Sequence, residues 1–306
     1  MFAQLDTKSV YSFMDSVVDL NTYVKRAKEL GYQSIGLMDR DNLYAAYHFA
    51  QLAIRNGLRP LIGTEANLFY EGRKIPFRLL AKNNQGYKNL IKLATELSSG
   101  QREFTYFSDY LNDIALILPS EDWEPGMSLG SEVFIGVRPE DAGKEFDYPV
   151  VPLHTVRYFE NADRSTIQTL HAISQNVSLS EVSICPMNQL LFSAKEMEEA
   201  YSKLPEALNN LNQLVSDVSY QFDTNLKLPR FNREMPAVDQ LRQLAQSGLD
   251  SKALREPAYQ ERLDKELSII HQMGFDDYFL IVWDLLRFGR SRGYYMGMGR
   301  GAAAGS

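Results

Sequence analysis

Short apolar runs alternate with amphipathic segments along the first part of the chain. The apolar runs are typical of buried strands, and the segments between them repeat apolar residues every three to four positions, as helices do. The pattern predicts strands over residues 3–5, 34–38 and 60–65 and helices over residues 20–30 and 43–55. This order predicts a parallel α/β sheet or barrel with its site at the C-terminal ends of the strands.

Beyond residue 65 the pattern continues with shorter elements. Residues 66–70 and 75–81 alternate apolar and polar positions around Glu71, Gly72 and Arg73, which predicts a hairpin with a tight turn. Further strands are predicted over residues 114–118, 133–137 and 150–153, and further helices over residues 85–97 and 164–173.

The alternation ends in a polar, proline-containing segment over residues 222–236. Segments of this kind separate domains, so we expect a first domain over residues 1–222 and a second over residues 223–306. In the second domain the predicted elements are helices over residues 238–249, 258–273 and 276–292 and a short strand over residues 294–298. The helix over residues 276–292 is apolar on nearly every side, which suits burial in a larger body.

The last ten residues are rich in glycine, alanine and serine and contain one arginine. Bare backbone N–H groups, a guanidinium and a hydroxyl are the donors that phosphate groups bind in proteins. The composition therefore suits a phosphate-binding turn, with Arg300, Gly301, Gly305 and Ser306 as the candidate residues. A linker or tail of similar composition is the alternative.

Composition narrows the class of protein. The chain has 306 residues with 44% hydrophobic positions, enough for a sizeable core. Its net charge of −7 argues against a free-standing, sequence-nonspecific DNA-binding protein, although a local basic cleft is compatible with it. The single cysteine, Cys185, excludes an internal disulfide framework, and no apolar run is long enough to cross a membrane, so we expect a cytoplasmic protein without membrane partners.

Two stretches near the end carry a resemblance to a known family. Residues 273–284 read Met-Gly-Phe-Asp-Asp-Tyr-Phe-Leu-Ile-Val-Trp-Asp, and residues 299–306 read Gly-Arg-Gly-Ala-Ala-Ala-Gly-Ser. They resemble the bacterial C-family replicative DNA polymerases, the DNA polymerase III alpha subunits, which carry Met-Gly-Phe-x-x-Tyr-Phe-Leu-Ile-Val-x-Asp and then Gly-Arg-Gly-Ser-Ala-Ala-Gly-Ser. Ala302 departs from the usual serine, which puts one donor of the loop in doubt.

The resemblance implies a DNA-directed DNA polymerase, a nucleotidyltransferase of DNA replication. It implies primer–template DNA, deoxynucleoside triphosphates and other replisome proteins as partners, and Mg²⁺ as the cofactor of the full-length enzyme. In the family, the aspartates that bind the catalytic metals come later than the residue that matches Ser306. We therefore expect residues 223–306 to be the mainly helical beginning of the polymerase palm, and the chain by itself to be inactive and without a cofactor.

The beginning of the chain resembles the polymerase-and-histidinol-phosphatase (PHP) domain with which these subunits open. That domain is a distorted β/α barrel in which histidines and carboxylates hold up to three metal ions. Asp39 and Glu65 match acidic ligands of the family, whereas most of its histidines are replaced. The positions of this chain that correspond to the family's metal ligands are Gln4, Asp6, Lys8, Asp39, Arg40, Glu65, Thr155 and Arg157.

These replacements introduce cations where the family binds metal cations. Lys8, Arg40 and Arg157 are expected to pair with the remaining carboxylates, Asp6, Asp39 and Glu65, so that an ion-pair network fills the volume of the metals. The barrel is then a structural domain that supports the palm and holds no metal.

Two alternatives to this structural role stay open from the sequence. One is a metal-dependent phosphoesterase or 3′–5′ exonuclease with another ligand set, namely Asp6, Asp39, Asp41, Glu65 and His154. The other is a non-catalytic interaction scaffold, in which the apolar helix over residues 278–288 is a partner surface.

Overall fold

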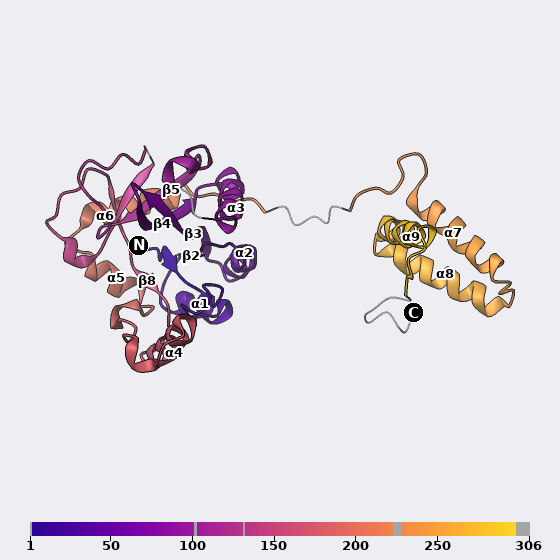
Figure 1. Cartoon of the computed structure of the whole chain (residues 1–306), viewed down its shortest axis with the longest axis horizontal. Helices are drawn as coiled ribbons and strands as arrows, with labels where there is room; N and C mark the ends of the chain where they lie inside the picture. The colour runs from indigo at the N-terminus through magenta and orange to yellow at the C-terminus, as the bar shows by residue number, and fades with distance from the viewer. Residues whose placement is uncertain (1, 101–102, 131, 223–227, 298–306) are drawn as a thin grey trace. The chain divides into compact units, whose positions relative to one another are not determined.

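The chain forms two compact units, residues 1–222 and residues 223–306, in a computed structural model (Figure 1). The first, here called the barrel unit, contains strands and helices, and the second, the helical unit, contains helices. The structure describes residues 2–100, 103–130, 132–222 and 228–297. Among these residues no helix is both long and apolar enough to span a lipid bilayer.

The centre of the barrel unit is a mixed six-stranded sheet in the order β2-β3-β4-β5-β6-β7. Its strands are β2 (Ser34–Arg40), β3 (Arg59–Tyr70), β4 (Arg73–Ala81), β5 (Ile114–Pro119), β6 (Val133–Val137) and β7 (Val150–Pro152). The predicted hairpin is confirmed as β3 and β4, joined at Glu71 and Gly72, which both have positive φ. Because this turn reverses the chain, β4 is antiparallel to β3, as a hairpin requires, and to β5 as well. The pairs β2–β3, β5–β6 and β6–β7 are parallel, as the alternation of strands and helices predicts.

Two short strands bring the edges of this sheet together. β1 (Asp6–Thr7) pairs in parallel with β8 (Thr155–Val156), which follows closely after β7. Gln4 forms a bridge to Ile35 of β2, so β1 also adjoins the other edge. The sheet thereby curls into a distorted barrel, and the predicted fold class is confirmed. The strand expected over residues 3–5 begins later, at Asp6, because pairing with β8 sets its position.

Gly36 allows the close approach between β1 and β2. Its N–H donates to the carbonyl oxygen of Gln4 at 2.6 Å, and a Cβ at this position would lie only 2.0 Å from the carbonyl oxygen of Leu5. Because the neighbouring atoms are backbone, only a residue without a side chain fits here.

Helices cover the outside of the barrel unit. α1 (Leu20–Glu29), α2 (Ala46–Arg55) and α3 (Asn84–Ser98) lie in a row outside β2, β3 and β4, and all three were predicted (Figure 1). Asp19 caps α1 by accepting a hydrogen bond from the Thr22 N–H, and Tyr23 and Ala27 on its inner face are buried. The remaining helices are α4 (Asp163–Gln175), α5 (Ala194–Ala200) and α6 (Pro205–Ser216) and the short 3₁₀ helices η1 (Phe104–Tyr110), η2 (Pro139–Asp141), η3 (Leu179–Glu181) and η4 (Met187–Gln189).

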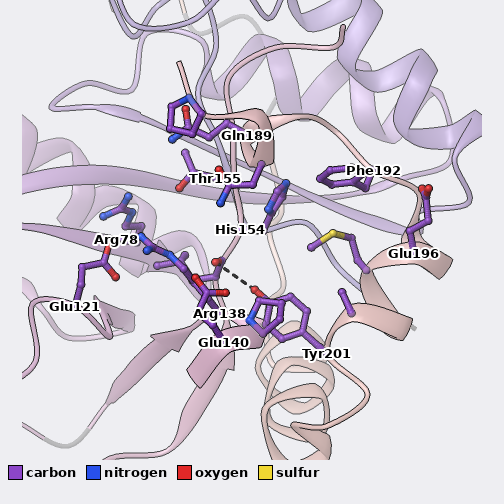
Figure 2. A pocket seen from close by; sticks show the side chains of 16 residues that line it. Arg78, Glu121, Arg138, Glu140, His154, Thr155, Gln189, Phe192, Glu196 and Tyr201 are labelled. Atoms are coloured by element: carbon purple, nitrogen blue, oxygen red, sulfur yellow. Dashed lines mark hydrogen bonds and ion pairs between the residues drawn. The ribbon is translucent and has the colours of Figure 1, made fainter. Parts of the chain in front are cut away.

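A cavity of about 530 Å³ opens beside the junction of β7 and β8 (Figure 2). Arg78, Arg138, His154, Phe192 and Tyr201 are among the side chains that line it. The hydroxyl of Tyr201 donates to backbone carbonyl oxygens at the ends of β6 and β7, which ties α5 to the sheet.

The helical unit contains α7 (Ala237–Ser251), α8 (Pro257–Gln272) and α9 (Asp276–Ser291), and α7 packs against both other helices. These three helices were predicted. Several large apolar side chains of α9, among them Tyr278 and Leu285, are at least half exposed within the described part of this unit, so burial of the helix in a larger body stays a prediction.

The segment after α9 corrects one expectation and leaves another outside the structure. Residues 294–297 form no strand, because the described part of the helical unit contains helices and offers no strand edge for pairing. The predicted phosphate-binding residues Arg300, Gly301, Gly305 and Ser306 lie outside the described residues.

Candidate functional site

The eight positions singled out from the sequence lie on, or within two residues of, the strands β1, β2, β3 and β8 of the barrel unit. Lys8 follows β1, Arg40 ends β2, and Arg157 follows β8. Glu65 of β3 stands directly opposite Arg40 in the register of β2 and β3. Strands that are distant in sequence therefore bring their charged side chains into one cluster.

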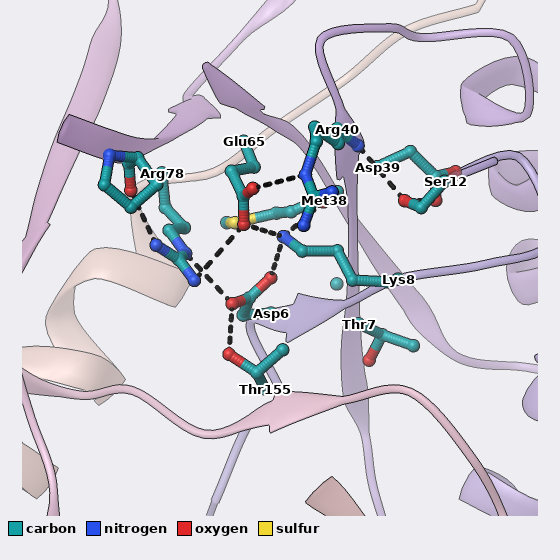
Figure 3. Close-up of polar contacts among 12 residues, drawn as sticks. Asp6, Thr7, Lys8, Ser12, Met38, Asp39, Arg40, Glu65, Arg78 and Thr155 are labelled. Atoms are coloured by element: carbon teal, nitrogen blue, oxygen red, sulfur yellow. Dashed lines mark hydrogen bonds and ion pairs between the residues drawn. The ribbon is translucent and has the colours of Figure 1, made fainter. Parts of the chain in front are cut away.

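Lys8 lies at the centre of this cluster and is fully buried (Figure 3). Its Nζ is 2.6 Å from Oδ1 of Asp6, 3.0 Å from Oε2 of Glu65 and 2.6 Å from the carbonyl oxygen of Met38. An ammonium has three N–H donors, and here each has an acceptor. The predicted pairing of Lys8 with Asp6 and Glu65 is confirmed.

Arg78 on β4 completes the pairing of the same two carboxylates, and the sequence analysis missed it. Its Nε donates to Oδ2 of Asp6 at 3.0 Å, and its Nη2 lies 3.3 Å from Oε2 of Glu65. The register of the hairpin places Arg78 directly opposite Glu65. A two-residue turn at Glu71 and Gly72 fixes that register. Counting residues back from the turn along both predicted strands would have placed Arg78 opposite Glu65.

Arg40 pairs with Glu65 from the other side. Its Nε lies 2.9 Å from Oε1 of Glu65, as the sequence predicted. Glu65 thus has an arginine opposite it on each neighbouring strand, Arg40 on β2 and Arg78 on β4. Both of its carboxylate oxygens therefore form ion pairs, Oε1 with Arg40 and Oε2 with Lys8 and Arg78.

Two neutral side chains close the cluster around Asp6. Thr155 donates from Oγ1 to Oδ2 of Asp6 at 2.6 Å. Gln4 donates from Nε2 to the backbone oxygens of Asp6 and His154, while its buried Oε1 has no hydrogen-bond partner among the described residues. Both residues stand at positions matched from the sequence to the family's metal ligands, and they direct hydrogen-bond donors at the strand and at Asp6.

Asp39 does not pair with a cation among the described residues, which corrects the sequence-based expectation. Its Oδ1 accepts hydrogen bonds from the Ser9 N–H and the Ser12 hydroxyl, and its Oδ2 accepts one from the Ser9 hydroxyl, each at 2.7 Å. The loop after β1 therefore supplies three neutral donors, which satisfy this buried carboxylate without a cation.

Arg157 also has a different partner from the one expected. Its Nε lies 3.2 Å from Oδ2 of Asp15, and it pairs with none of the three carboxylates predicted for it. Asp15 is buried. Its Oδ2 also lies 2.8 Å from Nη2 of Arg40, and its Oδ1 lies 3.1 Å from Nε2 of His171. Asp15 was missed because its loop carries no recognisable pattern.

The cations determine the protonation of the two central carboxylates. Burial by itself raises the pKa of Asp6, but Lys8 and Arg78 outweigh this and hold its pKa well below the usual range. For Glu65, burial also opposes ionisation, yet Lys8, Arg78 and Arg40 lower its pKa to about 2. Both groups are therefore ionised at neutral pH.

The residues present do not fit a metal ion at this place. The Lys8 ammonium lies between the carboxylates of Asp6 and Glu65, where a metal ion would bind, and their oxygens accept from cations. Within the described parts of the chain, no group of three or more histidine, cysteine or acidic side chains is arranged to hold a metal. The alternative ligand set is dispersed as well, since Asp41 binds Asn67 and the Nε2 of His154 lies 2.8 Å from a backbone oxygen.

Comparisons with known proteins divide the chain into two matched regions. Residues 4–124 match the family model described as PHP domain. Residues 239–306 match the model described as bacterial DNA polymerase III alpha NTPase domain. The first match contains the buried network except Thr155 and Arg157, and the second extends to the last residue of the sequence.

Individual relatives match along the whole chain. DNA polymerase III subunit alpha of Streptococcus pyogenes serotype M1 is 50% identical over 309 residues, covering 100% of this chain and 30% of the relative. The corresponding subunit of Bacillus subtilis is 30% identical over 349 residues, with 100% and 31% covered. The chain thus spans about 30% of the length of these curated relatives.

Solved structures add little to these sequence matches. A protein from Bifidobacterium adolescentis, assigned as a metal-dependent phosphoesterase, is 18% identical with a TM-score of 0.27. It covers 31% of this chain and 32% of its own chain. Similarity this low bears on neither the fold nor the site.

Proposed function

Because the chain belongs to the family of bacterial DNA polymerase III alpha subunits, we propose that it serves template-directed DNA synthesis as part of a DNA-directed DNA polymerase. The single observation that carries this proposal is 50% identity to the streptococcal subunit over the whole chain. Primer–template DNA, deoxynucleoside triphosphates and other replisome proteins are the partners of this role. A cytoplasmic location and Mg²⁺ as the cofactor of the complete enzyme belong to the same proposal.

The two units divide this role between support and nucleotide binding. The barrel unit is a structural domain whose buried ion pairs take the place of metal ions. The helical unit begins the polymerase palm and leads to Arg300, Gly301, Gly305 and Ser306, which contact the triphosphate of the incoming nucleotide. An arginine and backbone N–H groups suit that contact because they offer positive charge and donors to phosphate oxygens.

The chain by itself neither extends nor degrades DNA under this proposal. Hydrolysis of a phosphodiester by the barrel would require metal-bound water, and Lys8 lies where the carboxylates would hold the metal. Two observations support a structural barrel. Lys8, Asp6 and Glu65 are buried, and each N–H group of the Lys8 ammonium already has an acceptor within the barrel unit.

A chimera tests the polymerase assignment. The chain replaces the matched 30% of the Streptococcus pyogenes subunit, and primer extension by the chimera is compared with that of the intact streptococcal enzyme. We expect extension within about tenfold of the parent, because half of the residues are shared and a loss of one order of magnitude corresponds to about 1.4 kcal/mol.

Two controls make the chimera decisive. The isolated chain, assayed with Mg²⁺ and with Mn²⁺ on a labelled primer–template, is expected to give neither longer nor shorter products. A chimera that folds but does not extend primers would contradict the polymerase assignment, and shortening of the primer by the isolated chain would contradict the structural role of the barrel.

A further inference from the structure

A cleft of about 320 Å³ lies directly over the buried network, at the mouth of the barrel. We call it the mouth cleft and define it by its lining residues, which are Arg40, Glu65, Asn67, Lys74, Pro76, Arg78 and Arg157. Lys74, Pro76 and Arg78 alternate along β4 and therefore share one face of the strand. The lining contains four cations and one carboxylate, although the chain as a whole carries a net charge of −7.

The carboxylates that neutralise part of this charge lie beneath the cations. Asp6, Asp15 and Glu65 are all buried, whereas Lys74 is exposed and the side chain of Arg40 is 40% exposed. A ligand that enters the mouth cleft consequently meets ammonium and guanidinium groups first. In a metal site the order is reversed, because there the carboxylates and imidazoles face the incoming cation.

Several of these cations keep donors for a ligand. Arg157 uses only its Nε, toward Asp15, and Arg40 uses Nε and Nη2, so both retain N–H groups without a partner among the described residues. Lys74 forms no ion pair or side-chain hydrogen bond within the same residues. Such donors, beside already neutralised carboxylates, suit the oxygens of phosphate groups.

Exposed aromatic rings are carried by two segments that contact Arg40, one of the lining residues of the mouth cleft. Phe13 and Tyr44 are each 81% exposed, and Tyr11 is 45% exposed. Asn42 joins the two segments that carry them, because its Nδ2 donates to the backbone oxygen of Tyr11 and its Oδ1 accepts from the N–H of Tyr44.

The same segments adjoin the cationic end of β2. The backbone N–H of Arg40 donates to the hydroxyl of Ser12, which lies between Tyr11 and Phe13 in the sequence. Rings this exposed contribute little to the core, and the segments that carry them contact a cation that keeps unused N–H donors.

We propose that the mouth cleft and the three aromatic side chains together bind single-stranded nucleic acid. Phosphate groups of the backbone contact Lys74, Arg40 and Arg157, and bases stack on Phe13 and Tyr44. Proteins that bind single strands without sequence preference combine these two features, a cationic groove and exposed rings. A free phosphate ion would need the cations alone and would leave the rings without a role. The site binds the strand without cleaving it and does not depend on the polymerase assignment.

Fluorescence anisotropy of a labelled oligothymidylate of about ten nucleotides tests this proposal, with the full chain as the binding protein. At low ionic strength we expect saturable binding, and the logarithm of the affinity should fall linearly with the logarithm of the salt concentration. The variant Lys74→Glu should weaken binding and reduce the magnitude of the salt slope by about 0.7 or more, the value for one phosphate contact.

The aromatic half of the proposal has its own variants. Phe13→Ala and Tyr44→Ala should each weaken binding about fivefold or more, as expected for loss of one stacked base, with the salt slope unchanged. Matched controls are Lys88→Glu, which reverses an exposed charge on α3 outside the mouth cleft, and Tyr259→Ala, which removes an exposed ring from α8. Both controls should bind as the unaltered chain does.

Three results would overturn the proposal. The first is absence of binding at low salt. The second is binding that Arg300→Ala abolishes while Lys74→Glu, Phe13→Ala and Tyr44→Ala leave it intact, because the strand would then occupy the C-terminal residues. The third is equal affinity for an oligomer with abasic sugars, together with displacement by inorganic phosphate at comparable concentration, which would assign the mouth cleft to phosphate alone.

Discussion

The ammonium of Lys8 lies 2.6 Å from the carboxylate of Asp6, and neither side chain has any exposure to solvent. A buried ion pair contributes little net stability when it forms, because both ions lose their hydration. Removal of one partner is a different matter, since the other charge then remains buried without compensation. This asymmetry makes Lys8 the most sensitive position of the network.

The substitution Lys8→Met should destabilise the barrel unit by about 3–5 kcal/mol, the usual cost of leaving one member of a buried pair. Methionine has a similar length but offers no donor, so Asp6 and Glu65 lose their shared cation. Urea denaturation measures the change in the free energy of unfolding.

The two tryptophans allow this experiment to separate the units. Trp123 belongs to the barrel unit and Trp283 to the helical unit, so fluorescence in a Trp283→Phe background reports the barrel unit alone. The exposed Lys88→Met serves as the control and should change stability by less than about 0.5 kcal/mol. If Lys8→Met lowered the free energy of unfolding as little as the control does, the buried carboxylates would not depend on the Lys8 cation.

Acid should destabilise the barrel unit within a defined pH range. The pKa of Glu65 is lowered to about 2, and the pKa of Asp6 is lowered as well. Stability from a group whose pKa is lower in the folded state is present above its unfolded pKa, near 4, and is lost as the pH falls through the folded pKa. The free energy of unfolding should therefore decrease from about pH 4 toward pH 2.

The variant Glu65→Gln isolates the contribution of Glu65 to this pH dependence. It should be less stable than the unaltered barrel at pH 7 and should lose less stability between about pH 4 and pH 2, since one titrating group is gone. Urea denaturation at several pH values, followed by Trp123 fluorescence, measures both quantities. Parallel pH profiles for the variant and the unaltered chain would exclude a major contribution of Glu65.

Gly36→Ala should destabilise the barrel unit by about 1–3 kcal/mol, the usual cost of overpacking a core. The added Cβ would lie within 2.0 Å of a carbonyl oxygen, so β1 and β2 would have to separate. The control is Gly248→Ala in α7, where nothing lies within 4 Å and φ is not positive. Because alanine favours helix, this control should stabilise the helical unit by about 0.5–1 kcal/mol. Equal effects at the two glycines, measured by thermal unfolding, would contradict the close approach at Gly36.

The sequence predicted those parts of the site that follow from position along the strands. Lys8, Arg40 and Glu65 each lie on or just after a strand whose apolar run is visible, and the C-terminal ends of parallel strands meet. Because these positions are close in space and carry opposite charges, the sequence was sufficient to predict that they form ion pairs. The helices that cover the sheet were predicted for a similar reason, since apolar residues at helical spacing mark the buried face.

The missed residues depend on information that local patterns do not contain. Arg78 required the register of a hairpin to be carried as far as Glu65, and Asp15 lies in an irregular loop whose path is set by contacts with Arg40, Arg157 and His171. Asp39 was expected to pair with a cation because cations stand at neighbouring ligand positions, whereas its donors are groups of Ser9 and Ser12. Side-chain hydroxyls can satisfy a buried carboxylate, and periodicity does not reveal when they do so.

Divalent metals should leave the stability of the unaltered barrel unit unchanged, because the cation between Asp6 and Glu65 is part of the chain. Neither EDTA nor Mn²⁺ is expected to shift its melting temperature. In Lys8→Ala, by contrast, the two carboxylates face a space without an ammonium, and Mn²⁺ should raise the melting temperature with increasing concentration, as a ligand of the folded state does. Scans of both proteins with Mn²⁺ and with EDTA measure this difference, and Lys88→Ala is the control for loss of a lysine. Stabilisation of the unaltered chain by Mn²⁺ to the same extent as Lys8→Ala would show that Lys8 does not occupy the position of a metal.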